Sequence, residues 1–208
     1  MNKNSEINAE RKKTKARILK AASLCFQRDG IKAVKMDDIA SMLSISKRTL
    51  YEIYSDKETL LYACVRERHK FIERRMKLLQ QKGRNPMEYL IEFYRLQVDR
   101  MSQTNPKFYL EMTKYPRVTT FLENKHRENS NKSADFFKGG VLAGYFRDDI
   151  NYDIVSHIGD ACMQHVMQSK LYEVYPMAEI FRNILFLFIR GFCTEKGQRE
   201  LDNLIVKL

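Results

Sequence analysis

The stretch from Met36 to Lys57 constrains this 208-residue chain most, because it predicts two short helices joined by a tight turn. Over residues 36–43, apolar side chains recur at the spacing of one helix face. The Ser46 hydroxyl is placed to cap a second helix, expected over residues 47–54. That helix is expected to bury Leu50 and Tyr54 and to expose cationic, hydroxyl and aromatic side chains, which suit phosphate and base-edge contacts in a DNA major groove.

This region resembles the helix-turn-helix of the TetR family of bacterial transcriptional repressors, over about residues 18–61. Three positions depart from the family pattern. Ser44 replaces the usual turn glycine, Lys35 replaces a threonine cap, and Arg48 stands where glycine is common. The segments that carry the resemblance are Asp38-Ile39-Ala40, Ile45-Ser46-Lys47, Thr49-Leu50-Tyr51, Tyr54 and Ser55-Asp56-Lys57-Glu58-Thr59-Leu60.

The resemblance implies a homodimeric, sequence-specific DNA-binding regulator, by default a repressor that a small apolar or amphipathic effector releases. It implies a helix-turn-helix domain over residues 9–56 and a helical effector-binding and dimerisation domain over residues 57–208. The partners implied are double-stranded DNA, a second copy of the chain and an unidentified effector. The expected DNA contacts are Ser46, Lys47, Arg48, Thr49, Tyr51, Tyr54 and Lys57.

Helical signals continue through the rest of the chain, and no useful length alternates with period two, so the predicted fold is all-α. Asn85-Pro86 and Asn105-Pro106 each predict a helix start, and the S-x-x-E pattern at Ser55 predicts a capping box. The helices expected outside the central stretch are 9–29, 57–80, 86–103, 106–115, 117–138, 152–171, 177–193 and 198–208.

The net charge of +11 favours a polyanionic partner, although a basic surface also suits anionic lipid or mere solvation. The first 60 residues carry +5 of this charge, so it is densest where the helix-turn-helix lies. No apolar run reaches the roughly 18 residues of a membrane span, and no secretory signal opens the chain. The four cysteines have no metal-binding spacing, which favours reduced thiols in a cytoplasmic protein over a redox switch.

An aromatic and methionine cluster follows the two Asn-Pro signals. Such side chains, with a few hydroxyls, can line an effector cavity, although an ordinary aromatic core is the competing interpretation. That some of them line a cavity follows mainly from the family resemblance. The candidates are Tyr89, Phe93, Tyr94, Phe108, Tyr109 and Met112.

The helix expected over residues 177–193 is apolar all round at residues 184–189, which predicts a second burying surface. In the TetR family the last two major helices of each chain form a four-helix bundle with the partner, which also implies a near-palindromic operator. A core wholly within one chain is the alternative. The expected interface residues are Ile158, Cys162, His165, Ile184, Leu187 and Phe188.

Other chemistry finds little support. There is no glycine-rich phosphate loop, catalytic triad or zinc signature, so we expect no enzyme activity, cofactor or metal. His157 and His165 share a helix face, where a metal is conceivable but a surface or interface role is favoured. The alternative function is a helical ligand-binding or scaffolding protein that does not read an operator.

Overall fold

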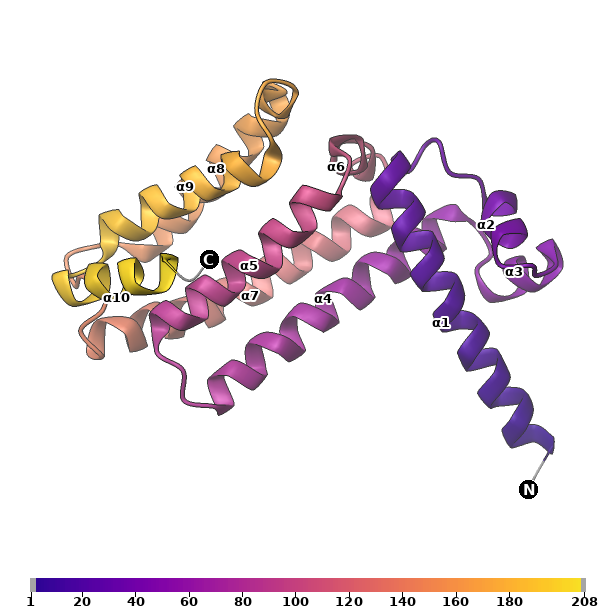
Figure 1. The fold of residues 1–208 in the computed structure, drawn as a ribbon, viewed down its shortest axis with the longest axis horizontal. Coiled ribbons are helices and arrows are strands. Elements are labelled where there is room, and N and C mark those ends of the chain that lie inside the picture. Colours follow the sequence, from indigo (N-terminus) through magenta and orange to yellow (C-terminus); the bar gives the residue numbers. More distant parts are fainter. Residues whose placement is uncertain (1–2, 207–208) are drawn as a thin grey trace. The chain divides into compact units, whose positions relative to one another are not determined.

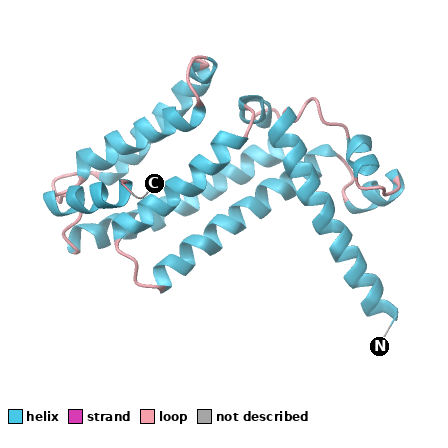
Figure 2. Ribbon diagram, viewed as in Figure 1, coloured by secondary structure: helices cyan, strands magenta, loops and turns pink. Residues whose placement is uncertain are grey.

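The computed structural model describes residues 3–206, apart from the side chains of residues 3, 4, 6, 7 and 129–132. Every regular element in this described part is helical, which confirms the all-α prediction (Figure 2). The elements, labelled in Figure 1, are α1 (Lys3–Asp29), α2 (Met36–Met42), α3 (Lys47–Ile53), α4 (Lys57–Gln81), α5 (Pro86–Gln103), α6 (Pro106–Met112), α7 (Pro116–Leu142), α8 (Tyr152–Gln168), the 3₁₀ turn η1 (Leu171–Glu173), α9 (Met177–Phe192) and α10 (Glu195–Ile205).

Several boundaries differ from the predicted ones. α1 begins at Lys3 instead of residue 9, and α7 continues through Gly139 and Gly140 to Leu142. The helix predicted over residues 117–138 ended just before these glycines, but Gly140 serves a close approach inside the helix. A Cβ atom at Gly140 would lie only 2.0 Å from the Phe146 ring, so a larger residue would not fit.

The start of α4 is capped one residue later than predicted. The Thr59 N–H donates to Asp56 Oδ1 at 2.7 Å, so Asp56 and not Ser55 is the cap. The Glu58 carboxylate accepts from the Arg117 N–H at 2.9 Å instead of closing a capping box. A carboxylate beside the N–H groups of a helix start is stabilised in its charged form, and the pKa of Asp56 is lowered accordingly.

The chain forms two compact units. The first ends at Phe71 and takes in Gln103–Leu122; the second contains Ile72–Ser102 and Glu123–Leu208. The start of α4 and all of α6 therefore belong with the helix-turn-helix, whereas the sequence placed the division at residue 57. These segments belong together because they share one hydrophobic core. Its fully buried members include Ile18, Phe26, Ile39, Leu50, Leu60, Leu61 and Val118.

The second unit has an aromatic core around Phe146, which lies 5.3 Å from the Phe192 ring, centroid to centroid. A smaller cluster of Val166, Met177 and Ile180 joins α8 to α9, which run side by side in Figure 1. None of the helices described within residues 3–206 is long and apolar enough to cross a lipid bilayer.

Candidate DNA-binding surface

The turn between α2 and α3 is closed by backbone hydrogen bonds. The Ser44 N–H donates to Ser41 O, and the Ile45 N–H donates to Ala40 O, both at 3.0 Å. This paired pattern ends a helix with its next residue in the left-handed region, and Ser44 has φ 52°. A non-glycine residue is strained there, and the hydrogen bonds hold Ser44 in place.

The two helices of the motif differ in how they start. The Thr49 N–H donates to Ser46 Oγ at 3.0 Å, which confirms the predicted cap of α3. The Ser46 and Thr49 hydroxyls also lie 2.8 Å apart. The Lys35 side chain caps nothing at the start of α2, so that helix relies on the acidic side chains of its first turn.

The two cations at the start of α3 are each held by a carboxylate. Lys47 Nζ lies 2.7 Å from Asp37 Oδ2, and Arg48 Nε lies 2.8 Å from Glu52 Oε1. These contacts raise the pKa of both cations. The Arg48 side chain remains 88% exposed, so the pairs are solvated and can be exchanged for phosphate oxygens. Sequence reasoning missed this role of the two acids, although the spacing of Arg48 and Glu52 was visible.

The two tyrosines expected at the DNA occupy different environments. Tyr51 is 44% exposed and stands on the same surface-facing helix as the cations. Tyr54 is only 3% exposed, and its hydroxyl is buried without a hydrogen-bond partner. Burial raises the pKa of Tyr54, and the Lys15 ammonium lies 5.7 Å from its ring centroid. The ring of Tyr54 therefore contributes to the core and is not presented to a groove.

Lys57 has a structural contact in addition to its expected DNA contact. Its Nζ donates to Ile31 O at 2.9 Å and to Lys32 O at 3.3 Å, which ties the start of α4 to the segment after α1. Burial lowers the pKa of this ammonium. An ammonium has three N–H donors, so one is left over for a phosphate.

A further contact that the sequence did not reveal joins α6 to the same segment. Glu111 Oε2 accepts from the Lys32 N–H at 2.7 Å. The Asn105 N–H also donates to Gln27 O at 2.7 Å. Nothing in the local sequence around Glu111 signals a partner about 79 residues away, because the contact depends on tertiary packing.

The predicted effector residues fall in both units. Phe108 is buried in the core of the first unit, with Tyr109 and Met112 packed against it. Tyr94 is buried in the second unit, with its ring 4.9 Å from that of Phe186. The two remaining candidates are partly exposed: Tyr89, whose ring lies 4.9 Å from that of Phe136, and Phe93.

The predicted interface residues lie on α8 and α9. Leu187 is 74% exposed, Ile158 is 47% exposed, and His165 is exposed as well. Cys162, Ile184 and Phe188 are partly buried. Ile154 adds a further exposed apolar side chain one turn before Ile158. Among the described side chains, no group of three metal-ligating residues gathers, at the histidines of α8 or elsewhere.

Comparisons with known proteins find similar bacterial transcriptional regulators. Residues 18–64 match the family model described as bacterial regulatory proteins, tetR family. The helix-turn-helix-type transcriptional repressor KstR2 of Mycolicibacterium smegmatis is 22% identical over 143 residues, which cover 66% of this chain and 70% of the repressor.

Solved structures share the fold. A putative transcriptional regulator from Saccharomonospora viridis, in complex with choline, superposes with a TM-score of 0.71 at 20% identity and covers 88% of this chain and 100% of its own. The ketosteroid transcriptional regulator KstR2 of Mycobacterium tuberculosis gives a TM-score of 0.59 at 19% identity, with 88% of this chain and 96% of that chain covered. Residues 18–64 therefore match the helix-turn-helix region of the tetR family of bacterial regulatory proteins, and transcriptional repressors are among the proteins to which this chain is similar.

Proposed function

We propose that the chain represses transcription by binding a near-palindromic operator through α3. The observation that carries this proposal is the exposed start of α3, where Lys47, Arg48 and Thr49 follow the Ser46 cap. A short helix with its first residues free in solution is the part that enters the major groove in helix-turn-helix proteins. Tyr51 and the spare donor of Lys57 would add backbone contacts.

Operator binding is tested by footprinting the DNA that flanks the gene for this chain. A protected, near-palindromic site supports the proposal. Uniform weak binding to all DNA contradicts it and favours a helical ligand-binding or scaffolding protein. On a footprinted site, we expect Arg48→Ala to relax the preference at one base position by about 1–3 kcal/mol.

Arg199→Ala is the matched control for Arg48→Ala. Arg199 is also an exposed arginine paired with a glutamate four residues away, Glu195, but it lies on α10. Its removal changes net charge equally and should leave base preference unchanged. Equal effects of the two variants would reduce the role of Arg48 to bulk electrostatics.

The proposed regulator is a homodimer joined through α8 and α9. The support is the exposed apolar surface of these helices, to which Ile154, Ile158 and Leu187 contribute. Exposed apolar side chains grouped on neighbouring helices are typical of association surfaces. A two-fold dimer would present two copies of α3 to half-sites about 34–36 Å apart or a multiple of that.

An effector is the remaining part of the proposal. A relative with the same fold is named as a ketosteroid regulator, which supports an apolar or amphipathic effector here. Release of the operator requires that the effector bind the DNA-free state more tightly than the DNA-bound state. Phe93, partly exposed among the aromatic residues of α5, is the candidate to test first.

The test adds a 3-ketosteroid to the operator complex of the wild-type chain and of Phe93→Ser. We expect release of DNA from the wild type only, with equal operator affinity of both proteins before the addition. If the steroid does not release the wild-type chain, that steroid is excluded as the effector. If it releases both proteins equally, Phe93 is not part of the site.

A further inference from the structure

A hollow of about 440 Å³ lies between the C-terminal half of α7 and the start of α8, within the second compact unit. This volume is in the range of small-molecule sites. None of the effector candidates proposed from the sequence lines it, so it is separate from the site tested with Phe93. Its lining residues are Ser133, Ala134, Phe137, Lys138, Val141, Asp148, Ile150, Tyr152, Asp153 and Ser156.

Two aromatic rings form part of the wall. The Phe137 and Tyr152 rings are stacked, with centroids 4.4 Å apart and planes 13° from parallel. The Tyr152 hydroxyl donates to Arg147 O at 2.5 Å, so its one hydrogen is used by the backbone and its oxygen remains an acceptor. Tyr152 therefore offers a ligand its ring and an acceptor oxygen, and Val141 and Ile150 add apolar surface.

The charges at the hollow are predominantly acidic in a chain whose net charge is +11. Asp148 and Asp153 contribute two carboxylates, and Lys138 contributes one ammonium. Arg147 does not add to the cations, because its guanidinium pairs with Asp149 at 2.5 Å. The Asp153 carboxylate lies 3.8 Å from the His157 ring, and it is 72% exposed, so a ligand can reach it from solvent.

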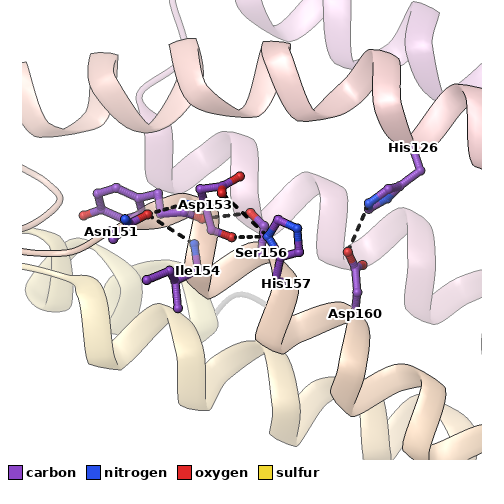
Figure 3. A network of polar contacts seen from close by, with 8 residues as sticks. His126, Asn151, Asp153, Ile154, Ser156, His157 and Asp160 are labelled. Atoms are coloured by element: carbon purple, nitrogen blue, oxygen red, sulfur yellow. Dashed lines mark hydrogen bonds and ion pairs between the residues drawn. The ribbon is translucent and has the colours of Figure 1, made fainter.

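The start of α8 offers no site for an anion. Asn151 Oδ1 accepts from the Asp153 N–H at 3.1 Å and from the Ile154 N–H at 3.2 Å, as Figure 3 shows. These are the donors that a bound anion would otherwise use. One turn further along, the His157 ring contacts Asp153 O at 2.8 Å, and His126 of α7 reaches Asp160 at 3.1 Å.

We propose that this hollow binds a small organic cation, with its ammonium group between Asp148, Asp153 and the aromatic rings. Carboxylates attract the charge, and an aromatic face within about 6 Å of an ammonium adds a favourable cation–π contact. The apolar part of the ligand packs on Val141 and Ile150, and Lys138 can donate to an acceptor at its other end. Binding at this site goes beyond the proposed operator function and does not depend on it.

The test measures binding of choline by calorimetry and compares it with 3,3-dimethylbutan-1-ol, which has the same shape without the charge. We expect choline to bind and the neutral alcohol to bind at least about fivefold more weakly, the factor that corresponds to 1 kcal/mol. Equal affinity of the two compounds would overturn the proposal, and so would the absence of choline binding at millimolar concentration. DNA binding is not involved, so failure here leaves the operator proposal intact.

Variants locate the site. Asp153→Asn and Asp148→Asn keep the side-chain shape and should each weaken choline binding by about threefold to fivefold, in the range of a solvated charge pair. Asp135→Asn is the matched control, because Asp135 is an exposed acid of α7 outside the hollow. Choline affinity that falls equally in all three variants would show a general charge effect and overturn the site. Thermal melting of each variant verifies that it is folded.

Discussion

The helix-turn-helix, α2 and α3, and the hairpin of α8 and α9 expose opposite kinds of side chain. The short helices bury their apolar residues in a core completed by α1, α4 and α6, and their exposed residues are mostly polar. The long helices leave Ile154, Ile158 and Leu187 largely in water. The first region therefore has a complete core within one chain, whereas the second has apolar surface that a further partner would cover.

The largest effect is expected when charges are placed on the exposed apolar surface of α8 and α9. Ile158→Glu combined with Leu187→Glu should abolish dimer formation, because two pairs of carboxylates would be buried without partners. Sedimentation equilibrium at micromolar protein should change from twice 24.7 kDa to a single chain. Operator affinity should fall by about a hundredfold or more, as two linked half-site contacts become independent.

Leu142→Glu is the control for the hairpin variant, because Leu142 is 81% exposed at the end of α7. It should stay dimeric. A wild-type chain that sediments as a monomer at all concentrations would contradict the dimer and the palindromic operator together.

The second prediction concerns the complete core. Leu50 of α3 is fully buried, so Leu50→Ala should lower the free energy of unfolding by about 2–5 kcal/mol. Leu142→Ala, at an exposed position, should change it by no more than about 0.5 kcal/mol. Urea denaturation followed by circular dichroism measures both. Similar small losses of unfolding free energy in both variants would mean that the core around Leu50 contributes little to the stability of the first compact unit.

Lys57 combines the proposed phosphate contact with a structural contact inside the first compact unit. Lys57→Ala should reduce the slope of log affinity against log salt by about one unit, equally for all DNA sequences. It should also reduce stability, because its ammonium donates to Ile31 O and Lys32 O. A change in base preference with an unchanged salt slope would contradict the phosphate role.

The cap of α3 should have a smaller effect. Ser46→Ala removes the acceptor of the Thr49 N–H and should cost about 1 kcal/mol of stability. Ser41→Ala, at an exposed serine of α2, is the comparison variant. Equal melting temperatures of the two variants would show that the backbone bonds of the Ser44 turn suffice to hold α3.

The smallest effect is expected at His157 on the exposed hairpin. Its hydrogen bond to Asp153 O and the adjacent carboxylate raise the pKa of His157 above its ordinary value of about 6.5. A raised pKa means that the contact stabilises the fold at low pH and is lost as pH rises through the folded-state pKa. NMR titration should show a lower His157 pKa in Asp153→Asn, and an unchanged value would leave only the backbone contact as the cause.

The contrast between regions also explains what the sequence could predict. The caps at Ser46, Asn105 and Asn151 act within a few residues, so local patterns located most helices and the whole reading motif. The helix was predicted to end before Gly140, but Gly140 lies inside α7, and the turn that follows brings Phe146 against it. The predicted helix 198–208 begins earlier, at Glu195, because Thr194 caps it; residues 207–208 lie outside the described part.

The features of the candidate sites also fall into those that the local sequence could predict and those that it could not. Exposure of Lys47 and Arg48 could be predicted from helix periodicity, and the structure agrees. The burial of Tyr54 could also be predicted from helix periodicity, and the structure agrees. The backbone contacts of Lys57 and the hollow beside Tyr152 could not, because each depends on residues distant in sequence. Local signals therefore predict secondary structure and caps well, and they predict the neighbours of a side chain poorly.

The carboxylates beside the cations of α3 have one more consequence. Asp37 and Glu52 occupy Lys47 and Arg48 in the free protein, so any nucleic acid must displace an internal competitor before it gains those contacts. Displacement weakens binding to every sequence by a similar amount. An operator recovers the loss through base-edge contacts, and random DNA does not. In the proposed operator complex, the two acids would thus lower affinity for all DNA equally, and the ratio between operator and random DNA would be set by the base-edge contacts alone.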